Sequence, residues 1–285
     1  MISCLRYIEL VREVTELARG EGFSIGEVRI SAEVPDWIAD ENHNRIRMIF
    51  VRSGTYRLRM ADIDRVVDPT VAYVARPGDV LWIAHKVGAT GLITSIAISR
   101  EFAGQAGAGI PSRSWVGTTA GDVDLTQRAL VARARRGADE FELSEQLSKL
   151  TRLMLGERAQ AGAAPRTGRS MHMRQKIIDI ARELLSENPD TLRLTDLAVR
   201  VGTSQSYLSR AFHQETGDTL SKFRNRLRVR QVLERIEGGE CDLARLAAEL
   251  GFSDHPHLTR TIREEVGGSP TIVRRIFDGT HDAAH

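Results

Sequence analysis

The chain has 285 residues and carries 40 lysines and arginines against 38 aspartates and glutamates, a formal net charge of +2. This length accommodates about two domains of roughly 100–200 residues each. The hydrophobic share of 41% and the charged share of 27% are ordinary for a folded protein. The composition therefore excludes a disordered chain, and the near-neutral balance neither favours nor excludes a nucleic-acid partner.

Targeting signals and cysteines bear on the compartment. No apolar run approaches the roughly 18 residues of a membrane-spanning helix. Residues 1–6 show neither the basic region nor the long apolar region of a secretory signal. The two cysteines, Cys4 and Cys241, lie far apart and form no metal-binding pair. We therefore expect a cytoplasmic protein with no membrane partner, in a compartment that keeps thiols reduced.

The first half of the chain shows strand patterns. Apolar and polar residues alternate over 46–50 and 56–60, and Ser53-Gly54 separates the two runs as a turn. Three more apolar runs follow, at 71–74, 80–84 and 92–98. The turn Arg76-Pro77-Gly78-Asp79 separates the first of these runs from the second. Several short strands separated by turn residues predict a small barrel or sandwich.

The period changes to a helical one over 124–155. An apolar stripe is formed there by Leu143, Leu147, Leu150 and Met154. These helices could pack on the barrel or on a second copy of the chain. The segment 157–170 is rich in Ala, Gly, Arg and Ser and has no apolar period, which predicts a linker after an N-terminal domain of residues 1–156.

Residues 171–285 are helical by pattern and contain an internal repeat. Leu197-Ala198-Val199-Arg200-Val201-Gly202-Thr203-Ser204 matches Leu246-Ala247-Ala248-Glu249-Leu250-Gly251-Phe252-Ser253, 49 residues later. Leu208-Ser209-Arg210-Ala211-Phe212 matches Leu258-Thr259-Arg260-Thr261-Ile262, 50 residues later, and Gly217 matches Gly267. Each copy predicts two short helices joined by a tight turn that contains glycine, which is the helix-turn-helix signature.

Capping residues define the expected helix ends. In the first copy Thr195 and Ser204 are expected N-caps, and Gly202 ends the first helix. In the second copy Asp242 is the first cap, and either Ser253 or Asp254 is the next. Ser269-Pro270 is suited to open a closing helix. The expected units are a first helix-turn-helix at about 195–217, a linker helix at 219–237 and a second helix-turn-helix at about 242–267.

The stretch from Leu194 to Arg275 resembles the DNA-binding domain of the AraC/XylS family. The resemblance is carried by Leu197-Ala198, Val201-Gly202-Thr203-Ser204, Tyr207-Leu208-Ser209-Arg210, Phe212, Glu215-Thr216-Gly217, Ile236, Leu250-Gly251-Phe252-Ser253-Asp254, His257-Leu258, Arg260, Gly267 and Ser269-Pro270. The sequence departs from the family pattern at Ile262, usually aromatic, at Pro256, and at Glu264-Glu265, which replace residues that are often basic.

The resemblance implies a transcription regulator whose two reading helices enter successive major grooves of double-stranded DNA, and it implies RNA polymerase as a partner. The expected fold class is α+β, with a barrel-like, cupin-like sensor domain before an all-α DNA-binding domain. Modulation by a small effector or by dimerisation is also implied. The expected protein is not an enzyme and has no cofactor. The sequence leaves open whether transcription is activated or repressed.

The N-terminal half of each reading helix faces the bases in a helix-turn-helix. The base-reading candidates are Gln205, Ser206, Ser209, Arg210 and His213 in the first unit and His255, His257, Thr259, Arg260 and Arg263 in the second. Arg210 and Arg260 could instead bind phosphates. Three basic residues recur every fourth position on the linker helix and are the phosphate candidates: Lys222, Arg226 and Arg230.

The N-terminal half resembles the barrel-shaped sensor domains found before this DNA-binding module. The resemblance is carried by Val51-Arg52-Ser53-Gly54, Asp68-Pro69-Thr70, Arg76-Pro77-Gly78-Asp79 and Ile83-Ala84-His85. A barrel mouth can hold a ligand. The effector-binding candidates are Tyr56, Tyr73, Trp82 and His85, and each could equally be a plain core or surface residue.

Three rival functions differ from regulation. A metal enzyme of the cupin type needs clustered histidines, yet only His43 and His85 precede residue 171, 42 positions apart. DNA repair by a methyl-accepting cysteine needs a cysteine framework that Cys4 and Cys241 do not form. An architectural DNA-binding protein without a ligand would bind independently of sequence. The first two are disfavoured, and the third would be recognised by its sequence-independent footprints.

Overall fold

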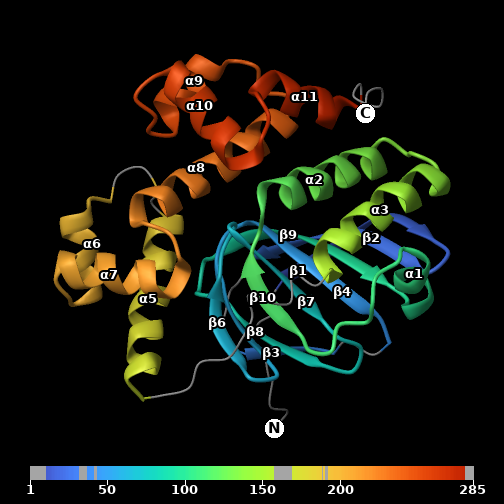
Figure 1. The fold of residues 1–285 in the computed structure, drawn as a ribbon, viewed down its shortest axis with the longest axis horizontal. Coiled ribbons are helices and arrows are strands. Elements are labelled where there is room, and N and C mark those ends of the chain that lie inside the picture. The colour runs from blue at the N-terminus through green and yellow to red at the C-terminus, as the bar shows by residue number, and fades with distance from the viewer. Residues whose placement is uncertain are drawn as a thin grey trace, which may run out of the picture.

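The computed structural model describes residues 11–31, 37–41, 44–156, 169–187, 189 and 192–279. Cys4, His43 and most of the expected linker 157–170 lie outside these residues, and residues 169 and 170 of that linker already belong to a helix. The described part divides into an N-terminal β-barrel with helices on one side and a C-terminal helical domain (Figure 1). This confirms the expected α+β architecture.

Two antiparallel sheets build the barrel. The larger sheet has the order β1-β2-β9-β4-β7-β10, and the smaller has the order β3-β8-β5-β6. The strands are β1 Val11–Gly20, β2 Phe23–Ser31, β3 Trp37–Glu41, β4 Ile46–Ser53, β5 Tyr56–Met60, β6 Ile63–Val67, β7 Val71–Ala75, β8 Val80–Ala84, β9 Thr90–Ile98 and β10 Trp115–Thr118. The five expected strands are present as β4, β5, β7, β8 and β9, whereas β1, β2, β3, β6 and β10 were not expected.

Strand alternation gives the larger sheet two buried faces. Residues such as Ile49, Tyr73 and Ile93 face the smaller sheet and fill the barrel interior. Residues such as Met48 and Val74 face the other way, toward the helices. Both faces of a central strand are therefore buried, which explains why the burial pattern of β4 is nearly continuous.

Three helices cover the outer face of the larger sheet (Figure 1). They are α1 Arg100–Gln105, α2 Gly121–Arg135 and α3 Glu140–Leu155. The expected helical segment 124–155 is thus two helices, separated at Gly137, which has a φ of 76°. The apolar stripe of α3 packs on the outer face of the larger sheet. Of the two packing partners considered from the sequence, the barrel is therefore the one that covers this stripe.

The C-terminal domain contains two small cores that share one long helix. Its helices are α5 Arg169–Glu187, α6 Leu194–Val201, α7 Gln205–Thr216, α8 Leu220–Glu237, α9 Leu243–Glu249, α10 His255–Val266 and α11 Pro270–Asp278. Phe223 and Leu227 of α8 pack with α5, α6 and α7. Val232 and Leu233 of α8 pack with α9, α10 and α11. None of the helices among the described residues is long and apolar enough to cross a bilayer.

Replacing Leu147 by alanine tests the packing of α3 on the barrel. Leu147 is completely buried, so Leu147→Ala should lower the free energy of unfolding by about 2–5 kcal/mol. The exposed Glu145 on the same helix provides the control, since Glu145→Ala should change stability by less than about 0.5 kcal/mol. Urea unfolding measures both, and equal midpoints for the two variants would contradict the packing described.

Candidate nucleic-acid interface

The first helix-turn-helix unit consists of α6 and α7. Gly202 ends α6 in the left-handed conformation, with a φ of 75°. Ser204 caps α7, because its hydroxyl accepts a hydrogen bond of 3.2 Å from the backbone N–H of Tyr207. Leu208 and Phe212 point into the core. The expected cap at Thr195 is wrong, since α6 begins at Leu194 and has no side-chain cap.

The base-reading candidates of α7 lie on the face opposite its core. Gln205, Ser206, Arg210 and His213 are exposed, and Ser209 is half-buried. A helix that buries one stripe presents the other to solvent. The structure therefore brings all five candidates to the open side of the unit.

The second unit, α9 and α10, follows the same plan. Asp242 caps α9. Asp254 caps α10 by accepting a hydrogen bond of 2.6 Å from the backbone N–H of His257, which decides between the two expected caps. Pro256 lies in the first turn of α10, where its missing N–H has no helical partner to lose.

Four of the five candidates of α10 remain available to a ligand. His255, Arg260 and Arg263 are exposed, and Thr259 is half-buried. His257 is tied to the turn instead. Its Nδ1 lies 3.1 Å from the Ser253 hydroxyl, and its ring stands edge-on to Phe252. His257 therefore holds the turn of the unit in place, and only its remaining ring nitrogen could reach DNA.

One helix, α8, fixes the two units relative to each other. Thr219 caps it by accepting a hydrogen bond from the N–H of Lys222. Its 18 residues span about 27 Å at about 1.5 Å per residue. Because its side chains belong to both helical cores, neither unit can turn without disturbing α8.

The phosphate candidates on α8 do not form an exposed row, which corrects the sequence expectation. Arg226 lies between two carboxylates, with Nη1 2.7 Å from Asp218 and Nε 2.8 Å from Glu265. Arg230 is buried, with 1% of its surface exposed. Lys222 remains exposed and pairs with Asp218 at 2.9 Å. The i, i+4 spacing does place them on one side of α8, but at Arg226 and Arg230 that side faces α10 and α2.

This arrangement also changes the expectation for Glu264 and Glu265. Glu265 points inward and pairs with Arg226 and Arg230. Only Glu264 is exposed on the surface. The acidic pair therefore contributes a single carboxylate to the outer side of the second unit.

Buried arginines join the barrel to the second unit. Arg52 on β4 lies 2.6 Å from Glu234 and 2.5 Å from Glu237, both on α8. Arg128 on α2 lies 2.8 Å from Glu234, 3.3 Å from Glu237 and 3.1 Å from Asp124. Both arginine side chains are 1% exposed. We call this cluster, together with Arg230 and Glu265, the arginine joint.

Arg230 completes the joint from the helical domain. Its Nε lies 3.2 Å from Asp124 on α2, and its Nη2 lies 3.3 Å from Glu265 on α10. The same Nη2 donates a hydrogen bond of 3.2 Å to the carbonyl oxygen of Thr119, just before α2. Arg230 therefore connects the linker helix, the second reading helix and the barrel domain.

Two carboxyl groups of the joint, Asp124 and Glu234, have lowered pKa values. The Arg128 and Arg230 guanidinium groups outweigh the effect of burial and hold the pKa of Asp124 below its ordinary value. Arg128 and Arg52 do the same for the pKa of Glu234. A carboxyl whose pKa is lowered by folding stabilises the folded state above its unfolded pKa. That stabilisation is lost as the pH falls through the folded pKa, so the contribution of Asp124 and Glu234 to the joint is lost in acid.

Apolar contacts continue the joint along α2. Leu125 belongs to the core of the second unit rather than to the barrel. At Gly121 the backbone of α2 meets the end of α10 so closely that a Cβ would lie 2.1 Å from the carbonyl oxygen of Glu265 and 2.7 Å from the Cα of Val266. Helix α2 is thus packed between the barrel and the second unit, as Figure 1 shows.

A second contact connects the barrel to α5, next to the first unit. Arg182 on α5 lies 2.7 Å from the buried carboxylate of Asp68. Lys86 lies 3.0 Å from both Glu183 and Glu187 of α5. Burial raises the pKa of Asp179, also on α5, to about 6. Lys86 is about half exposed, so this contact is more open than the arginine joint.

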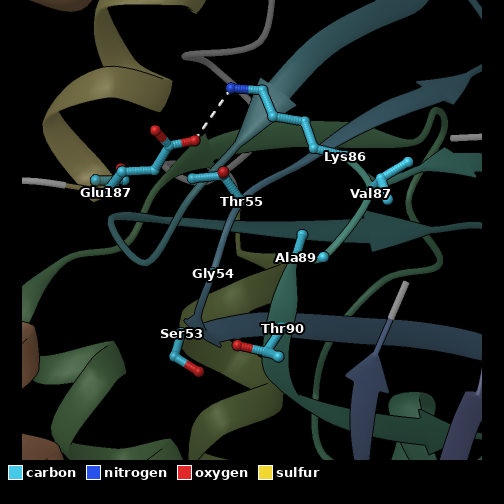
Figure 2. A pocket seen from close by; sticks show the side chains of 10 residues that line it. Ser53, Gly54, Thr55, Lys86, Val87, Ala89, Thr90 and Glu187 are labelled. Atoms are coloured by element: carbon cyan, nitrogen blue, oxygen red, sulfur yellow. Dashed lines mark hydrogen bonds and ion pairs between the residues drawn. The ribbon is translucent and has the colours of Figure 1, made fainter. Parts of the chain in front are cut away.

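A crevice of about 440 Å³ lies at this second contact. It is lined by the β4–β5 turn, the β8–β9 loop and the last residues of α5. In Figure 2 the Lys86 side chain reaches across to Glu187, while Ser53, Thr55 and Thr90 lie along the barrel side. None of the effector candidates named from the sequence lines this crevice.

Three of the four effector candidates meet inside the barrel. The hydroxyl groups of Tyr56 and Tyr73 lie 2.9 Å apart, and burial raises the pKa of Tyr73 to about 12. The His85 ring is 5.0 Å from that of Tyr56, and burial lowers the pKa of His85 to about 4. Trp82 is 45% exposed and does not join them.

A metal site was also considered from the sequence. Among the described residues no three histidine, cysteine, aspartate or glutamate side chains are grouped to hold a metal ion. Cys241 is an exposed free thiol.

Sequence comparisons identify the helical domain. A family model described as "Helix-turn-helix domain" matches residues 197–276. The uncharacterized HTH-type transcriptional regulator YfiF of Bacillus subtilis (strain 168) is 25% identical over 158 residues, 54% of this chain and 50% of that protein. The HTH-type transcriptional activator RhaS of Escherichia coli O139:H28 is 30% identical over 90 residues, 32% of each chain. The chain thus spans half or less of these relatives' length.

Solved structures show further likeness. A transcriptional regulator of Chromobacterium violaceum with an AraC-type DNA-binding domain is 27% identical over 36% of this chain and 93% of its own, with a TM-score of 0.35. ToxT from Vibrio cholerae O395 covers 91% of this chain and 100% of its own, at 13% identity and a TM-score of 0.38. Both TM-scores are low, so the assignment rests on the sequence matches and on the geometry above.

The fold and the exposed reading helices define a DNA-binding module of two helix-turn-helix units on one linker helix, joined to a β-barrel. The helical domain is a helix-turn-helix domain of the AraC/XylS type. This confirms the resemblance read from Leu194 to Arg275. The pairings of the arginine joint were missed, although Arg52, Arg230 and Glu265 were named from the sequence, because local patterns carry no signal for partners so distant in sequence.

Replacing Gly121 by alanine tests the joint. The added methyl group would overlap Glu265 and Val266, so α2 and α10 must separate. Gly121→Ala should therefore speed amide hydrogen exchange at the end of α10 at least tenfold. In the control, Gly104→Ala, the new Cβ meets nothing within 4 Å. Unchanged exchange in α10 of Gly121→Ala would contradict the close approach of α2.

Proposed function

We propose that this protein is a sequence-specific transcription regulator that binds promoter DNA through α7 and α10. The observation that carries the proposal is that two helix-turn-helix units share α8 and both present exposed arginines, Arg210 and Arg260, on their reading helices. In such units the reading helices enter major grooves. A single chain with its units fixed in this way would read an asymmetric site in successive grooves.

The contacts of α8 support a regulatory role for the barrel. The arginine joint attaches the barrel to α8 and α10, so any shift of the barrel also moves a reading helix. If the barrel has two positions relative to the helices, a ligand that binds one of them more tightly would shift the protein toward that position. The resulting change in DNA affinity is limited by the ratio of the ligand's affinities for the two positions. The effector, its contacts with Tyr56, Tyr73 or His85, and RNA polymerase as a partner are parts of this proposal.

Selection from random DNA tests the proposal. The full chain is used to enrich binding sites from a random pool, and fluorescence anisotropy then compares an enriched site with its scrambled version. Specific proteins typically bind their site about 10³–10⁷ times more tightly than other DNA. No enrichment, or equal affinity for both DNAs, would favour an architectural protein that binds independently of sequence.

Arg210→Ala tests base reading. A bidentate arginine–guanine pair contributes about 1–3 kcal/mol of discrimination, so affinity for the enriched site should fall by roughly 5- to 150-fold while affinity for scrambled DNA stays nearly the same. Arg59→Ala on the barrel, a half-exposed arginine of β5, is the matched control and should change neither affinity. Equal losses on both DNAs would assign Arg210 to phosphate binding.

Lys222 and Arg226 are distinguished by salt dependence. Lys222 is exposed, whereas Arg226 lies between Asp218 and Glu265. Lys222→Ala should therefore make the slope of log affinity against log salt shallower by about 1, and Arg226→Ala should leave the slope unchanged. A shallower slope for Arg226→Ala would show that Arg226 leaves its carboxylates to bind a phosphate.

A further inference from the structure

The strand β1 is an open edge of the larger sheet. It has ten residues, and among the described strands it pairs only with β2. The opposite edge, β10, has four residues. Residues 12–16 of β1 are all exposed, and Val14 is 63% exposed. An edge of this length presents unpaired backbone groups that can pair with another strand.

The apolar stripe of α3 and most of α2, first considered as a dimer surface, are already covered within one chain. The apolar stripe of α3 is buried against the outer face of the larger sheet. Helix α2 is buried along most of its length between the barrel and the second helix-turn-helix unit. Of the four edge strands in the described barrel domain, β1 is the longest, with ten residues against five in β3, five in β6 and four in β10.

Symmetry restricts how two copies of one strand can pair. Directly opposed residues of antiparallel strands point to the same face, so a two-fold axis must pass through one residue that faces its own copy. An axis at Glu13 or at Glu16 would oppose like charges, which is unfavourable. An axis at Thr15 would place the apolar Val14 against Glu16.

An axis at Val14 gives a complementary set. Val14 then faces Val14 of the second copy, and Arg12 faces Glu16 twice, once on each side of the axis. Opposite charges facing each other across a strand pair are stabilising. Charged edges commonly prevent sheet pairing. The β1 edge carries charges of both signs, and each Arg12 faces a Glu16 when the axis passes through Val14. These charges therefore favour the Val14 register over the others.

We propose that two copies of this protein associate through their β1 strands, antiparallel about Val14, and form one continuous sheet. The contact needs little rearrangement. Glu16 pairs in the single chain with Arg19, and both side chains are about half exposed or more, so the pair contributes little and can be exchanged. The Nη2 atom of Arg12 lies 2.9 Å from Asp40 in the single chain. The other N–H groups of its guanidinium remain to bind Glu16 of the second copy.

Cysteine cross-linking tests the register in the full chain, with Cys4 and Cys241 replaced by serine. Opposed residues in antiparallel strands have Cα atoms about 4.5–5.5 Å apart, within the range of about 4.4–6.8 Å that a disulfide needs. Val14→Cys should therefore form a dimer under mild oxidation. Neither Arg12→Cys nor Glu16→Cys should form a disulfide dimer by itself, because the two copies of either residue lie about 13 Å apart at about 3.3 Å per residue. A mixture of the two variants should form a disulfide between the cysteine at position 12 of one copy and the cysteine at position 16 of the other.

Arg19→Cys is the control, since the two copies of that residue would be about 33 Å apart at about 3.3 Å per residue. Cross-linking of Arg19→Cys as fast as Val14→Cys, or of Glu16→Cys alone as fast as the mixture, would overturn the register. Val14 and Glu16 are exposed, so these variants are expected to fold, and circular dichroism verifies this.

Sedimentation measures the association of the unmodified chain. Glu16→Arg would place a guanidinium opposite Arg12 and should weaken the dimer at least tenfold. The same change on the exposed Glu145 of α3, Glu145→Arg, should have no effect. A chain that stays monomeric at 100-fold the concentration used for cross-linking, or two variants that dissociate equally, would overturn the proposal. DNA binding enters none of these measurements, so their outcome is independent of the proposed regulator function.

Discussion

The burial of three arginines at one place is the constraint on which the domain arrangement depends. Arg52, Arg128 and Arg230 are among the largest fully buried side chains of the protein. Moving an ion out of water costs several kcal/mol even in real proteins. The structure offsets this cost by placing each guanidinium between carboxylates from another element. A partial separation of barrel and helices would leave buried charges unpaired, so the joint favours either complete contact or complete opening.

The two helix-turn-helix units are consequently held in different ways. The second unit is attached to the barrel by the buried joint and by Leu125 in its core. Among the described residues, α5 connects the first unit to the barrel through one buried pair, Arg182 with Asp68, and through the half-exposed Lys86, which pairs with two glutamates. Exposed pairs contribute little to stability. In the sequence the second unit departs from the family pattern and the first does not. In the structure the two units also differ in how they are attached to the barrel.

Local signals in the sequence predicted the local structure well. Capping residues and left-handed glycines such as Ser204 and Gly202 fix helix ends through contacts within a few residues, so a short stretch of sequence contains the whole signal. The unexpected strands β1 and β2 are long, but their pattern is broken because β2 buries the charged Glu27 beside Arg135. These segments are strands because they pair with each other and, in the case of β2, with β9. A short stretch of sequence does not show such pairing.

The phosphate candidates show the same limit at the level of single side chains. A spacing of four residues tells which side of α8 a group occupies, but not what that side faces. Arg230 meets Asp124, more than a hundred residues earlier. Glu265 meets the same arginine from α10, while its neighbour Glu264 points outward because successive helical residues are about 100° apart. The recognition helix of the second unit therefore combines two tasks: one side chain holds the joint, and its neighbour remains at the surface that would meet DNA.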